Sequence, residues 1–243
     1  DSGVVTVATG TSNPGGSGNL VLSTGGATGG NGGDITIAVG SGNTGSGGAV
    51  SISGGETSAP SFVGGAVTLN SGVGSAPGSS SGEIRIHTAE SSAPGGVSGN
   101  IRMSTGDANG GSSGSIFLTT GESTAASAGN IELNPGQTPN AAGDGGDVII
   151  KGGAAVSSSG GDVTVTSGTS SGSTSGEIKI LTGTAHPDAS VDTGDLHLST
   201  GITTAGDSGV LRLGSGAATG GNSGAVSIGS GDVTTGNAGT IDI

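Results

Sequence analysis

The chain contains no cysteine, tryptophan or tyrosine, and it has only five lysines and arginines in 243 residues. Without cysteine it has no thiol nucleophile, no zinc-thiolate centre and no disulfide. The scarcity of basic and aromatic residues, together with a net charge of −13, leaves no surface of the kind that binds nucleic acid. No apolar run approaches the ~20 residues of a membrane-spanning helix. We therefore expect no nucleic-acid partner and no membrane insertion.

Groups able to perform catalysis are equally scarce. The three histidines are His87, His186 and His197, and none belongs to a His-Glu-x-x-His motif or stands beside another histidine. An active site also needs a cleft that brings titratable groups together, and this composition offers little bulk to build one. We expect a protein that is not an enzyme and has no cofactor.

Glycine is abundant, with 58 residues, and its placement is periodic. A composition with many glycines and few aromatic residues is typical of low-complexity or disordered chains. Here, however, a glycine is followed two and four residues later by an aliphatic residue sixteen times, with Met103 filling one site. We call this glycine the anchor and the two residues the first and second aliphatic. The anchors, at steps of 15, 17 or 18 residues, are Gly3, Gly18, Gly33, Gly48, Gly65, Gly82, Gly99, Gly114, Gly129, Gly146, Gly161, Gly176, Gly194, Gly209, Gly224 and Gly239.

The alternation of aliphatic and polar residues in each repeat predicts one short β-strand per repeat. A fixed period of this length is typical of solenoids, in which each unit is stabilised by its neighbours. The sequence predicts an all-β fold: a single-chain parallel β-solenoid, or flattened β-helix, of about 15 coils with 15 to 18 residues per coil. Residues 1–243 form one repeat domain in this interpretation, and all 32 aliphatics point inward against a wall of small residues.

Three of the longer repeats carry an Ala-Pro pair twelve residues after the anchor, ending at Pro60, Pro77 and Pro94, and Pro139 and Pro187 lie in the same region of other long repeats. The prediction stacks these pairs along one edge. They are either an insertion on a binding face or prolines that prevent lateral strand pairing.

Acidic residues recur directly after the anchors, and four of them occupy consecutive repeats. Stacked like charges repel, and a hard cation such as Ca²⁺ would bridge them because it prefers carboxylate oxygens. The alternative is a solvated acidic column, relieved by local pairs such as Glu83 with Arg85 and Glu177 with Lys179. The metal candidates are Asp147, Asp162, Glu177 and Asp195.

Both ends of the sequence run directly into the repeat, from Asp1-Ser2-Gly3 to the aliphatic Ile243. An uncapped strand stack is a template for further pairing. We therefore expect an excerpt of a longer array, or a subunit that associates with itself end to end into a filament. Exposed serines and threonines are acceptors for O-glycans.

Units such as Gly-Asn-Ile-Arg-Met-Ser-Thr-Gly at 99–106 resemble the Gly/Ser/Thr-rich β-solenoid arrays of secreted or surface fibre proteins of algae, other protists and phage tails. The resemblance implies an extracellular or cell-surface location and a structural role, as the rod-like subunit or shaft segment of a filament or appendage. An ice-binding surface, with threonines ten residues after the anchor such as Thr28 and Thr204, is one alternative. An adhesin or glycan-binding rod is the other.

Overall fold

The computed structural model describes residues 2–138, 143–184, 192–234 and 236–242. The chain divides into two units, Asp1–Phe117 and Leu118–Ile243. The division falls inside the repeat that begins at Gly114. Each unit is therefore described by itself. Pro139, Pro187, His186 and Ile243 lie outside the described residues.

The described residues contain no helix and no β-strand. The prediction of an all-β, single-chain parallel β-solenoid of about 15 coils is therefore wrong. The alternating segments exist as extended chain, but a strand needs a ladder of hydrogen bonds to a neighbour. The backbone hydrogen bonds found across the repeats instead join one residue at each side of a bend, and no ladder continues from them.

Bends, rather than strands, are the regular local structure of both units. In Asp1–Phe117 they fall at 13–15, 28–30, 43–45, 59–61, 76–78, 93–95 and 109–111. Most contain a glycine with positive φ, as at Gly45 (86°) and Gly110 (88°), a conformation that glycine adopts without the steric cost of a Cβ. The anchor glycines have no positive φ, so the sequence pattern places the conformationally demanding glycines outside the aliphatic segments.

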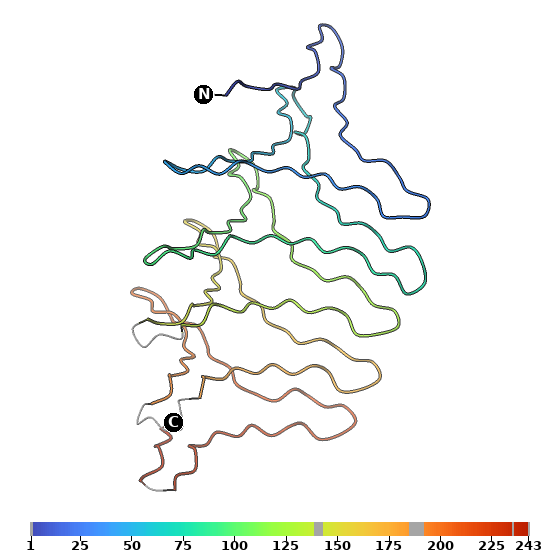
Figure 1. Cartoon of the computed structure of the whole chain (residues 1–243). Helices are drawn as coiled ribbons and strands as arrows, with labels where there is room; N and C mark the ends of the chain where they lie inside the picture. The colour runs from blue at the N-terminus through green and yellow to red at the C-terminus, as the bar shows by residue number, and fades with distance from the viewer. Residues whose placement is uncertain (1, 139–142, 185–191, 235, 243) are drawn as a thin grey trace. The chain divides into compact units, whose positions relative to one another are not determined.

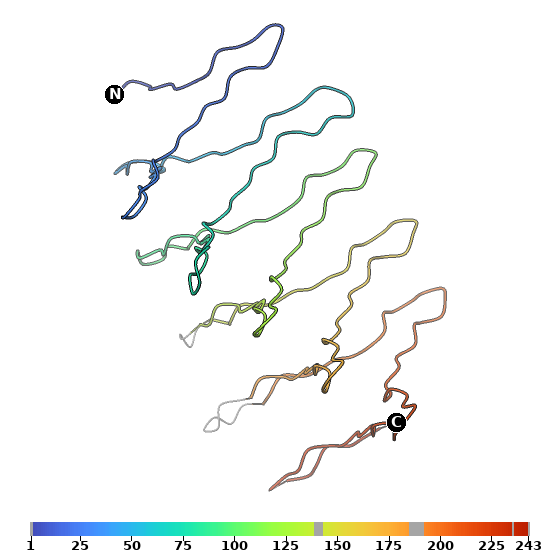
Figure 2. The ribbon, with the colours of Figure 1, turned by 90° about the vertical axis from the view of Figure 1, so that its right-hand side faces the viewer.

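The winding of each unit also differs from one repeat per coil. In Asp1–Phe117 the bends at 13–15, 59–61 and 109–111 lie in one row, at the right in Figure 2, and the bends between them lie on other sides (Figure 1). Two other bends separate each member of this row from the next. A turn of the chain therefore takes three repeats, and consecutive aliphatic segments diverge instead of stacking.

Most of the anchor glycines lie where two backbone segments, one on each side of a bend, come close together. In five repeats the anchor amide donates a hydrogen bond to the carbonyl of the glycine that precedes the bend, as from Gly65 to Gly55 at 2.8 Å and from Gly161 to Gly153 at 2.8 Å. In two others a threonine hydroxyl donates to the anchor carbonyl: Thr24 to Gly33 at 3.0 Å and Thr105 to Gly114 at 3.3 Å. Each of these bonds closes the base of a loop around a bend.

No described residue is buried. From Ile35 onward the first aliphatic of each repeat is 48–56% exposed, and the described second aliphatics are 53–74% exposed. Val5 in the repeat from Gly3 is 90% exposed. Neighbouring repeats therefore cover the later positions only in part. The prediction that the aliphatics form an interior is wrong for one chain, because the turns do not close over them.

Candidate functional site

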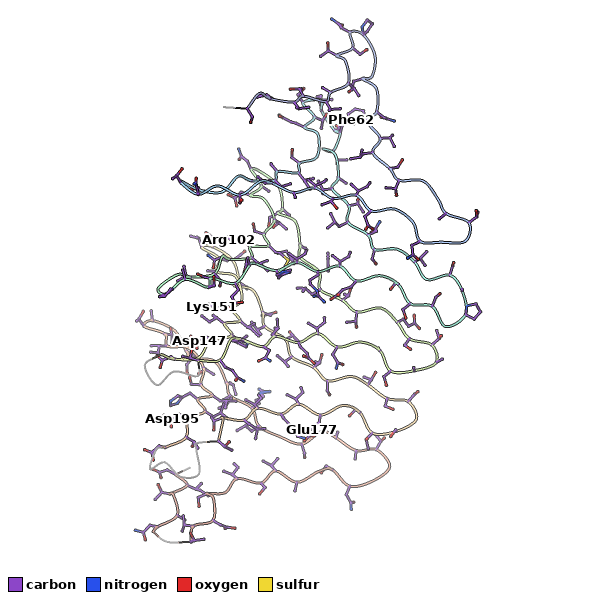
Figure 3. The ribbon with its side chains drawn as sticks, in the orientation of Figure 1. Phe62, Arg102, Asp147, Lys151, Glu177 and Asp195 are labelled. Atoms are coloured by element: carbon purple, nitrogen blue, oxygen red, sulfur yellow. The ribbon has the colours of Figure 1, made fainter. Side chains whose placement is uncertain are left out.

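The predicted calcium ligands are not gathered by the structure. Asp147, Glu177 and Asp195 lie well apart in the side-chain view (Figure 3). Among the residues that the structure describes, no group of three or more acidic or histidine side chains could hold a metal ion. Because one turn takes three repeats, residues at the same position of consecutive repeats point to different sides. Asp147, Asp162 and Glu177, from three consecutive repeats, therefore do not form the column that the sequence predicts, and Asp195 lies one turn after Asp147.

Charged residues of the repeats pair locally instead. Arg85 meets Glu83 at 2.9 Å, and Lys179 meets Glu177 at 2.9 Å, which confirms both predicted pairs. His197 lies 3.7 Å from Asp195 and forms an ion pair only when protonated. All six side chains are more than two-thirds exposed, so each pair contributes little to stability.

The bends do not assemble into a recognition surface either. The Ala-Pro bends at 59–61, 76–78 and 93–95 are consecutive, so they lie on different sides of the winding rather than along one edge. The threonines ten residues after the anchor, considered for ice binding, are not aligned either. Thr204 and Thr219 are two of them, and they lie in consecutive bends. The structure therefore supports neither a row of Ala-Pro pairs nor a flat rank of threonines.

The one surface that recurs in every repeat is apolar. We call it the aliphatic face: the first and second aliphatics of the repeats, together with the extended backbone that carries them. Where two consecutive segments meet before they diverge, the second unit has a shallow, open depression lined by Leu133, Pro135, Val148 and Ile150, with Asp147 at its side. The sequence analysis identified Leu133, Val148 and Ile150 as aliphatics of the repeat but assigned them to an interior.

The residue six positions after each anchor is a feature that sequence reasoning missed. In most repeats it lies against the next anchor glycine, as Thr24 against Gly33, Val39 against Gly48 and Thr105 against Gly114, whereas a Cβ on Gly18 or Gly194 would meet nothing within 4 Å. At these positions the chain carries threonine, serine, valine, proline or glycine. A recurrent small or β-branched residue immediately before a glycine was the available signal. It positions the aliphatic face by fixing the base of each loop.

Comparison with known proteins gives no relative. No protein-family model, no curated protein and no solved structure matches this sequence. The resemblance to secreted fibre arrays therefore depends on the repeat residues alone. In the part of the chain that the structure describes, no helix is long and apolar enough to cross a membrane.

Proposed function

We propose that this protein is a structural subunit or segment of an extracellular filament or surface appendage, and that it assembles with copies of itself. The observation that supports this proposal is the aliphatic face, which the chain repeats along its length and leaves uncovered. A binding module ordinarily exposes one apolar patch of a few hundred Å². Here the same small apolar unit recurs in every repeat, which suits a partner that is itself repetitive.

The exposed area supports the same proposal quantitatively. A folded monomer of 22.0 kDa exposes about 9,300 Å², whereas this chain exposes 23382 Å². The surplus is about 14,000 Å², and a standard interface needs only about 800 Å² on each partner. Ordering each residue costs about 1–2 kcal/mol, and aliphatics that stay half exposed contribute only part of the ~1.5–3 kcal/mol available from full burial. One chain alone lacks the burial that would hold it in this conformation.

The extracellular location follows from the resemblance to secreted arrays and is part of the proposal. The absence of cysteine is compatible with an extracellular and with an intracellular location, because hydrogen bonds between repeats can stabilise a secreted protein in place of disulfides. O-linked glycans on the exposed serines and threonines would add solubility without blocking the aliphatic face.

Assembly of the purified chain tests the proposal. Sedimentation velocity and negative-stain electron microscopy over a concentration series should show elongated assemblies that grow with concentration. Ile37→Asp, which places a charge in the aliphatic face, should reduce assembly at least tenfold. Ile37→Asn and Thr36→Asn are the uncharged matched pair: the amide at 37 should also reduce assembly, whereas the amide at the neighbouring polar position 36 should leave it nearly as in wild type, because it adds no charge that would be repeated between copies. A chain that stays monomeric at all concentrations and folds cooperatively would refute the proposal.

A further inference from the structure

The backbone of the aliphatic segments is unpaired in one chain. Backbone hydrogen bonds occur at the bases of loops and within bends, for example from Gly82 to Gly72 and from Ser79 to Ala76. No described segment between an anchor and its second aliphatic belongs to a ladder. Extended backbone with free N–H and C=O groups is a template for another chain. The aliphatic face therefore offers hydrogen-bonding groups and apolar side chains together.

We infer that these groups are paired by copies of the same chain lying parallel and in register, repeat against identical repeat. This inference rests on the proposed function, because it specifies how the copies meet. In such an arrangement each first aliphatic packs against the first aliphatic of its neighbour. The backbone hydrogen bonds that one chain leaves open form between chains.

The uneven repeat lengths favour this register. In chain order the steps between anchors begin 15, 15, 15, 17, 17, 17, and a single step of 18 follows Gly176. A copy in register meets a repeat of equal length at every junction. A copy shifted by one repeat, or running antiparallel, places 17-residue repeats beside 15-residue repeats at several junctions. A second copy in register is thus the partner whose repeat lengths match throughout.

The charged side chains of the Glu83–Arg85 and Glu177–Lys179 pairs are compatible with copies lying in register. In register, Glu83 would lie beside Glu83 and Arg85 beside Arg85, which alone would be repulsive. Because Glu83 already pairs with Arg85 at 2.9 Å and Glu177 with Lys179 at 2.9 Å, each position is close to neutral before the copies meet. Each glutamate also gains a diagonal arginine or lysine from the neighbouring copy.

Spin labelling tests the register directly, and the chain has no native cysteine to interfere. Thr36→Cys lies between Ile35 and Ile37 in the first unit, and Thr164→Cys lies between Val163 and Val165 in the second. In assembled protein, a nitroxide at either site should lose its resolved three-line spectrum to a single exchange-narrowed line. Dilution with a tenfold excess of unlabelled chain should restore three lines.

A mixture of the two labelled chains is the register control. Each label should behave in the mixture as it does when diluted twofold with unlabelled protein. Assemblies whose labels never couple, or whose 36 and 164 labels couple with each other, would overturn the register while leaving the proposed function intact. A chain that does not assemble, or becomes ordered only on phosphatidylcholine vesicles, would overturn both. Light scattering on the same samples separates these outcomes.

Discussion

Glycines in this chain have two distinct structural roles, and different glycines fulfil each role. In Asp1–Phe117 most of the bends contain a glycine with positive φ, whereas the anchors and their partners allow backbone segments to approach. Sequence periodicity located the anchors, but spacing alone reveals that a position is small and not whether the backbone there needs positive φ or a close approach. The difference leads to opposite expectations for substitutions at neighbouring residues.

Ser61 is the exception among the bend residues with left-handed backbone, with φ of 65°. The equivalent positions after the next two Ala-Pro pairs are Gly78 (78°) and Gly95 (77°), and the amide after each glycine donates to the alanine carbonyl at 3.0 Å. This is a β-turn with proline at its second position and glycine at its third, the arrangement that such a turn favours. Ser61→Gly should raise the free energy of unfolding of the assembled protein by up to about 1 kcal/mol, seen as a higher urea midpoint. Gly78→Ser should lower it, and equal midpoints for both variants would contradict this assignment.

Gly152 and Gly153 are adjacent residues with different surroundings. A Cβ on Gly152 would meet the carbonyl oxygen of Gly161, whereas a Cβ on Gly153 meets nothing within 4 Å. Gly152→Ala should therefore destabilise the assembled protein by roughly 1–3 kcal/mol in urea titrations, and Gly153→Ala should change stability by a few tenths. If both alanines have the same effect, the close approach at this loop base is absent.

Loops closed at their base are the elements of this chain, and hydroxyl groups close some of them. Thr24 donates to the Gly33 carbonyl at 3.0 Å across nine residues. Thr24→Val keeps the shape and removes this bond. In an exposed loop the loss should be near 0.5 kcal/mol, the lower end for a hydrogen bond, together with faster amide exchange in residues 25–32. Thr36→Val, whose hydroxyl makes no recorded hydrogen bond in the structure, is the control, and an equal response from both would contradict the bond's role.

The elements show how far sequence reasoning reached. The alternation of aliphatic and polar residues and the Glu83–Arg85 and Glu177–Lys179 pairs are local features, set within a few residues of the chain, and both pairs were predicted. The bends were not predicted, since the residues between the aliphatic segments were expected to form a wall of small residues. Stacking of segments is non-local. The sequence pattern that indicates a half-buried strand does not specify which segment covers it, whether the next repeat or another molecule, and the prediction chose the next repeat. The calcium column failed to form for the same reason, since Asp147 and Asp162 were assumed to stack.

At the scale of the whole molecule, an excess of negative charge opposes the association of copies. The chain carries 18 acidic residues against five basic ones, and only some of the acidic side chains have local partners. Screening shortens the reach of this repulsion from about 10 Å at 0.1 M salt to about 3 Å at 1 M. The critical concentration for assembly should therefore fall several-fold over that range. A critical concentration that rises with NaCl would show that attraction between charges, rather than apolar burial, holds the copies together.

The central claim is that the aliphatic segments gain backbone partners only between chains. Amide hydrogen exchange, resolved by peptide, measures this directly in monomer and in assembled protein at equal pH and temperature. We predict that segments such as 33–39 and 161–167 exchange nearly as fast as an unstructured chain in the monomer and at least a hundredfold more slowly in the assembly. Strong protection of these segments in the monomer, unchanged on assembly, would contradict the account.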